Sequence, residues 1–227
     1  LDPKSGGLMP FLPSRKWLDS DELSPMEPVS FPSRDGATLY GYLTLPKGRG
    51  AGPIPLILNI HGGPQGRDTW GFDPEVQFFA KLGYAVFQVN YRGSTGYGKI
   101  YEGQDLLKVC RYSIDDVADA ARWAIRENYA DPNRIAIFGE IFGGYAALAG
   151  ATFEPELYRC AIGFAGIYDW VMKMKVDSKD WRRRDLFAWR DDYYPDFKEH
   201  RDEYLAVSPR FAAEKIRIPV LLVHGGS

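Results

Sequence analysis

Residues 139–144, Gly-Glu-Ile-Phe-Gly-Gly, have the spacing of a nucleophile elbow without its nucleophile. In the pattern GxSxG, a serine occupies a sharp turn between a strand and a helix, and the turn exposes its hydroxyl for attack on a carbonyl carbon. The central position here is Ile141. Because an alkyl side chain has no proton to release and no lone pair to attack with, this position lacks the atom on which acyl transfer depends.

Strand-like and helix-like segments alternate on both sides of this hexapeptide. Apolar or alternating runs predict strands at residues 38–45, 55–60, 84–90, 134–138, 160–164 and 218–223, and periodicity or capping signals predict helices at 73–80, 113–128 and 143–151. Strands separated by helices indicate βαβ units and a mainly parallel sheet flanked by helices. We therefore predict an α/β fold with its site at the carboxyl ends of the strands.

Glycines surround the expected site. Gly62 and Gly63 follow the predicted strand 55–60, where the missing β-carbon would let backbone N–H groups approach a substrate oxygen. Gly63 and the amide of Phe142 are therefore candidate oxyanion-hole donors, although a plain tight turn would use the same glycines.

Gly139 and Gly143 have a different expected role. They lie on either side of the central position of the elbow. We expect them to let the following helix pack closely against the strand.

Five motifs in order resemble the catalytic domain of prolyl oligopeptidase-type serine peptidases, in particular the acylaminoacyl peptidase and dipeptidyl-peptidase group. They are His61–Pro64, Asn90–Gly98, Asp131–Ile137, the elbow with Tyr145–Leu148, and Pro219–Gly225. The resemblance runs from about residue 29 to the end. It implies an α/β-hydrolase fold, in a family where an amino-terminal β-propeller usually admits only short peptides.

The resemblance also implies a domain organisation. Residues 1–28, which are rich in proline and serine, would be a linker or arm at the tail of a missing amino-terminal domain. Residues 29–227 would be the peptidase domain, truncated before its last strand and helix.

The implied chemistry is serine attack on the carbonyl of a short peptide or acyl-peptide, with a histidine base and no cofactor or metal. In the family the acid follows the strand expected at 218–223 and the histidine comes later, so we expect neither before Ser227. His61 is then expected to be a hydrogen-bonded structural residue rather than the base. Arg92 is expected to order loops at the mouth of the site, with direct substrate contact as the alternative.

Composition argues against several other classes of protein. With 28 basic and 30 acidic residues the formal charge is -2, which does not favour binding to nucleic acid or to an anionic membrane. No apolar run approaches the ~20 residues that span a bilayer, and no export signal is visible, so we expect a cytoplasmic location. Cys110 and Cys160 lack metal-ligand spacing and are expected to be reduced, buried thiols rather than replacement nucleophiles.

Ile141 leaves three hypotheses for function. The chain is a serine peptidase domain in incomplete or substituted form, a pseudohydrolase that binds a ligand or partner near Gly63 and segment 177–204, or a purely structural module. Segment 177–204 is charged and aromatic and is expected to form a helical excursion over the site, with Arg182–Arg184 as a solvated face.

Two structural expectations follow from the same residues. The elbow either keeps a positive φ, with Ile141 filling the place of a serine, or relaxes to an ordinary conformation. If the strand at 218–223 is poorly covered, it exposes apolar surface and allows self-association through the sheet edge.

Overall fold

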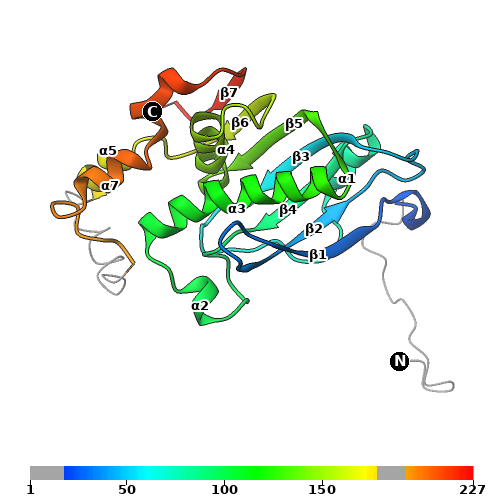
Figure 1. Ribbon diagram of the computed structural model, residues 1–227, viewed down its shortest axis with the longest axis horizontal. Coiled ribbons are helices and arrows are strands. Elements are labelled where there is room, and N and C mark those ends of the chain that lie inside the picture. The colour runs from blue at the N-terminus through cyan, green and yellow to red at the C-terminus, as the bar shows by residue number, and fades with distance from the viewer. Residues whose placement is uncertain (1–17, 178–192, 227) are drawn as a thin grey trace.

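The computed structural model describes residues 18–177 and 193–226. Its centre is a 7-stranded sheet in the order β1-β2-β4-β3-β5-β6-β7 (Figure 1). The strands are β1 (Met26–Pro32), β2 (Thr38–Thr44), β3 (Ile54–Ile60), β4 (Ala85–Asn90), β5 (Ala130–Glu140), β6 (Cys160–Phe164) and β7 (Val220–Val223). β1 and β2 are antiparallel to their neighbours, whereas β4, β3, β5, β6 and β7 run parallel. The predicted mainly parallel α/β sheet is confirmed.

Helices cover both faces of the sheet. The helices in the described part of the chain are α1 (Pro74–Lys81), α2 (Lys99–Glu102), α3 (Leu106–Arg126), α4 (Phe142–Phe153), α5 (Trp170–Asp177) and α7 (Arg201–Ala206), with 3-10 turns η1 (Ser20–Glu22) and η3 (Pro209–Lys215), and α1, α3 and α4 pack on the sheet. Successive residues of a strand point to opposite faces. On β5, Ile137 faces Gly150 of α4, whereas the ring of Phe138 lies 6.0 Å from that of Phe79 on α1. α3, which crosses in front of the strands in Figure 1, packs beside α4.

Capping explains where two of the helices begin. The Asp73 carboxylate accepts hydrogen bonds from the amides of Glu75 and Val76, and Pro74 occupies the first turn of α1, as the sequence predicts. α3 begins at Leu106, seven residues before the predicted start at 113, because Asp105 caps it through the amide of Lys108. Its buried face includes residues of this extra segment, such as Cys110, so packing supports the earlier start.

One strand was not expected from the sequence. β1 begins at Met26, inside the segment predicted as a linker, although Pro28 and Pro32 lie within it. β1 is an edge strand, and prolines are tolerated at an edge because some of its N–H groups have no strand partner. The division at residue 28 stays a prediction, and β1 crosses it.

Other expectations concern exposure. Cys110 is buried but Cys160 is only half-buried, so the prediction of two buried thiols is wrong for the second. Leu221, Leu222 and Val223 of β7 are exposed, with relative accessibilities of 55%, 47% and 38%. Most of segment 177–204, including Arg182–Arg184, lies outside the described residues. In the described ranges, no helix has the length and apolar character needed to cross a bilayer.

Three glycines allow α4 to approach the sheet ends. A β-carbon on Gly139 would lie 2.5 Å from the carbonyl carbon of Gly143 and 2.7 Å from the carbonyl oxygen of Ile60. One on Gly143 would overlap the Ile60 carbonyl, and one on Gly144 would lie 2.7 Å from the carbonyl oxygen of Phe164. Backbone atoms cannot move aside as a flexible side chain can, so this contact requires glycine.

We predict that Gly143→Ala destabilises the chain by about 1–3 kcal/mol or more, because the added methyl group displaces α4 from the end of β3. Urea denaturation would measure the change. Gly50→Ala is the matched control, since a β-carbon there meets nothing within 4 Å. Equal unfolding midpoints for the two variants would contradict the role of Gly143.

Candidate functional site

Ile141 keeps the strained conformation of a nucleophile elbow. It lies between β5 and α4 with φ 56° and ψ −111°. Its N–H donates to the carbonyl oxygen of Phe164 at 2.8 Å, and its own carbonyl accepts from the N–H of Tyr145 at 3.1 Å. A positive φ is an outlier for a β-branched residue. Of the two expected conformations, the structure therefore has the strained one, and the side chain is 56% exposed.

The loop after β3 lies against this elbow. A β-carbon on Gly62 would stand 3.1 Å from the carbonyl oxygen of Glu140 and 3.4 Å from Cβ of Ile141. Gly63 follows with φ 130°. The amides of Gly63 and Phe142 have no hydrogen-bond acceptor among the described residues. Their use as oxyanion-hole donors stays a prediction.

His61 is held by its neighbours on both ring nitrogens. Nδ1 lies 2.8 Å from the carbonyl oxygen of Gly62, and Nε2 lies 2.9 Å from Oγ of Ser94. Burial lowers the pKa of His61 to about 4, so the ring is neutral at neutral pH. These contacts fit a structural role, and neither leads to Ile141.

Tyr91 is a supporting residue that the sequence reasoning missed. Its fully buried ring stacks on His61 at a centroid distance of 4.6 Å and on Phe142 at 5.7 Å. Its hydroxyl donates to the carbonyl oxygen of His61 at 3.2 Å. Burial raises the pKa of Tyr91 well above its usual value, which keeps this donor protonated. The ring joins the end of β4 to both glycine-rich turns. A large aromatic residue directly after a predicted core strand was the available signal.

The side chain of Arg92 contacts Asp116, Asp35 and Tyr112 rather than the residues of the elbow. Nη2 lies 2.6 Å from Oδ1 of Asp116 on α3, and Nη1 lies 2.6 Å from Oδ2 of Asp35 in the turn after β1. The guanidinium carbon stands 3.9 Å from the ring centroid of Tyr112. Burial is the largest single effect and lowers the pKa of Arg92, but the hydrogen bonds and negative charges of Asp116 and Asp35 together raise it above its usual value. Arg92 therefore ties α3 to the first hairpin, and its contacts favour loop ordering over substrate binding.

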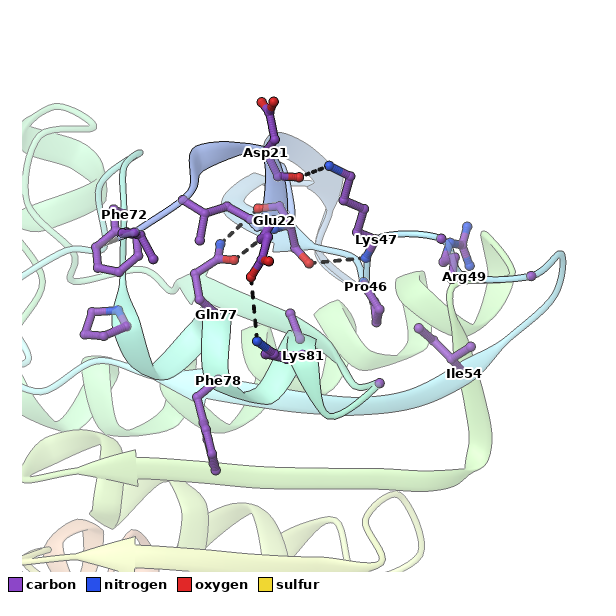
Figure 2. Close-up of a pocket in the computed structure, with 18 residues that line it drawn as sticks. Asp21, Glu22, Pro46, Lys47, Arg49, Ile54, Phe72, Gln77, Phe78 and Lys81 are labelled. Carbon is purple, nitrogen blue, oxygen red and sulfur yellow. Dashed lines mark hydrogen bonds and ion pairs between the residues drawn. The ribbon is translucent and has the colours of Figure 1, made fainter. Parts of the chain in front are cut away.

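A groove lies elsewhere on the molecule. It has a volume of about 920 Å³ and is enclosed by η1 and its flanks, the loop between β2 and β3, and α1 (Figure 2). Ile54, which lines it, pairs with Ala130 at the opposite end of β5 from the elbow. Gln77 spans one side by exchanging two hydrogen bonds of 2.9 Å with the backbone of Ser24. This groove is not part of the candidate site.

The sheet order, the elbow and the adjoining glycine loop define an α/β-hydrolase. A family model described as the prolyl oligopeptidase family matches residues 70–227, and the chain belongs to this family. The chain is 38% identical over 172 residues to dipeptidyl aminopeptidase BIII of Pseudoxanthomonas mexicana, covering 73% of this chain and 25% of that protein.

Solved structures agree with this assignment. A puromycin-hydrolyzing peptidase of Mycobacterium tuberculosis superposes with a TM-score of 0.79 at 27% identity, covering 92% of this chain and 32% of the other. An acylaminoacyl peptidase of Pyrococcus horikoshii superposes with a TM-score of 0.75 at 28% identity, covering 89% of this chain and 32% of the other. The chain thus spans about a quarter to a third of the length of these relatives.

We predict that Ile141→Gly raises the stability of the chain by about 1 kcal/mol. Glycine relieves a backbone strain of roughly 1–3 kcal/mol, and this gain exceeds its larger loss of chain entropy. The exposed isoleucine side chain contributes little burial. Ile100→Gly, at a 90% exposed position of α2, is the control and should lower stability. A lower thermal midpoint for both variants would show that the elbow is not strained.

We predict that Arg92→Met lowers the free energy of unfolding by about 3–5 kcal/mol, because it leaves the buried carboxylate of Asp116 without its cation. Chemical denaturation should show a loss that is larger at high pH than at low pH, because burial raises the pKa of Asp116 and a protonated carboxyl group needs no cation. Arg134→Met removes the more exposed ion pair with Asp131 and should have a much smaller effect. Similar losses for both variants would contradict a buried structural role for Arg92.

Proposed function

We propose that this chain is the elbow-bearing part of a serine peptidase catalytic domain, and that with Ile141 it cannot form an acyl-enzyme. The observation that supports the proposal is the elbow at Ile141: its backbone is strained as a nucleophile requires, while its side chain is chemically inert. Membership of the prolyl oligopeptidase family supports the hydrolase framework.

The proposed reaction belongs to a form of the protein with serine at position 141. The serine oxygen would bond to the carbonyl carbon of a peptide or acyl-peptide, and a histidine base would take its proton. The amides of Gly63 and Phe142 would stabilise the negative oxygen of the tetrahedral intermediate. The leaving amine would receive the proton, and water would then release the acyl group.

Short peptides are the proposed substrate class. A puromycin hydrolase variant has been solved in complex with PGG, which supports a peptide-sized site in a relative. The two free amides beside Ile141 suit a peptide carbonyl.

A pseudohydrolase is the second candidate. Ile141 and Phe164, which is 44% exposed, present apolar side chains beside the free amides. Such a surface could bind a peptide without cleaving it. A purely structural module remains the third hypothesis, and no particular contact favours it.

The test uses protein expressed from its full reading frame, with its intact mass verified, in the Ile141, Ile141→Ser and Ile141→Ala forms. A fluorophosphonate probe should label only the serine variant, which should also hydrolyse a peptide or ester. An inert, unlabelled serine variant would favour the pseudohydrolase, provided that it is folded. Hydrolysis by the Ile141 form at the rate of the serine variant would refute the proposed inactivity.

In the 227-residue polypeptide, Ile141→Ser should remain unlabelled. Its histidines are His61, His200 and His224, and their recorded contacts are with Ser94, Glu203 and Gly225 rather than with the elbow. Probe labelling above that of Ile141→Ala would show that a base reaches the serine in this polypeptide.

A further inference from the structure

The loop that carries Gly63 is fastened to β4 through Asp68. The N–H of Asp68 donates to Oδ1 of Asn90 at 2.8 Å, and Nδ2 of Asn90 donates to the carbonyl oxygen of Asp68 at 3.1 Å. Beside this backbone exchange, Nε2 of Gln88 donates to Oδ1 of Asp68 at 3.0 Å. Three side chains thus join the segment between β3 and α1 to the sheet.

Two atoms of this cluster lack partners. Oδ2 of Asp68 and Oε1 of Gln88 are buried and have no hydrogen bond among the described residues. Gln88 is only 3% exposed. Buried acceptors without donors are costly, and an ionised carboxylate offers only acceptors.

A single proton would supply the missing donor for both atoms. A carboxylic acid facing a primary amide can form two parallel hydrogen bonds, one from the amide N–H and one from the acid O–H. The Gln88 to Asp68 bond is the first of these, and the two unpartnered oxygens are the atoms that the second would join.

We propose that Asp68 is a neutral carboxylic acid in the native protein and donates from Oδ2 to Oε1 of Gln88, so that this acid–amide pair holds the Gly63 loop on β4. Asp68 is a positioning residue and touches no reacting atom. The proposal goes beyond the proposed function and does not depend on it, because it concerns the native protonation state of the loop.

The electrostatic surroundings agree with a retained proton. Burial raises the pKa of Asp68, the hydrogen bond from Gln88 lowers it and the charge of Asp73 raises it, and together they place it at about 7. Further titratable or charged groups near this cluster come from three segments. Arg67 precedes Asp68 and contacts Gly96, Tyr91 and Tyr97 follow β4, and Tyr42 of β2 pairs with Gln88 of β4.

The sign of the pH dependence follows from these values. In the unfolded chain an aspartate has a pKa of about 3.9, so between about pH 4 and 7 the native state binds more protons than the unfolded state. The stability contributed by Asp68 is present in full below pH 4 and is lost as the pH rises through about 7.

Asp68→Asn tests the proposal, because its Nδ2–H₂ can replace the acid O–H and cannot ionise. From pH 5 to 8 the unfolding constant of the unmodified chain should rise about 100-fold relative to that of Asp68→Asn. Asp202→Asn is the control: its side chain is 97% exposed, and its pH profile should follow the unmodified chain. Parallel profiles for the unmodified chain and Asp68→Asn would overturn the proposal.

A second measurement does not depend on the variant folding. The carboxyl-carbon NMR signal of Asp68, followed by pH titration of the unmodified chain, should report a midpoint near 7 and a protonated group at pH 6. A signal that is already that of the carboxylate at pH 6 would overturn the proposal, whatever the variants show.

Discussion

The contact of backbone with backbone between α4 and the ends of β3 and β5 is the constraint on which the site depends. Gly139 and Gly143 allow this contact because any β-carbon there would collide with fixed carbonyl groups. Both ends of the turn are held in this way, and the residue between them must connect them. Ile141 therefore adopts φ 56°, although its own side chain disfavours it.

The surroundings of the turn are built in layers from distant parts of the chain. Tyr91, at the end of β4, lies between His61 of one glycine loop and Phe142 of the other. Asp68 fastens the outer part of the first loop to the same strand. Contacts at β4 therefore hold both glycine-rich turns, and the residue between them carries the alkyl side chain of Ile141. The backbone shape of the turn therefore does not depend on which side chain occupies position 141.

Much of the architecture could be predicted from the sequence because it depends on local signals. The strand at Cys160–Phe164 and the capped start of α1 were predicted at their observed positions. β1 was not predicted because its prolines are typical of a linker. Its pairing with β2 alone makes it an edge strand, where prolines are tolerated. The early start of α3 depends on burial of residues near Cys110, which periodicity alone did not reveal.

The sequence by itself determined the family motifs, the order of the strands from β2 to β7 and the absence of a nucleophilic atom at position 141, since each depends on residue identity and spacing. Only the tertiary structure decided that Ile141 keeps the strained turn, that Arg92 binds Asp116, and that one oxygen each of Asp68 and Gln88 is buried without a donor. Those outcomes depend on which groups, far apart in sequence, are packed together, because the surrounding contacts enforce a strained backbone and burial sets the cost of an unpaired polar group.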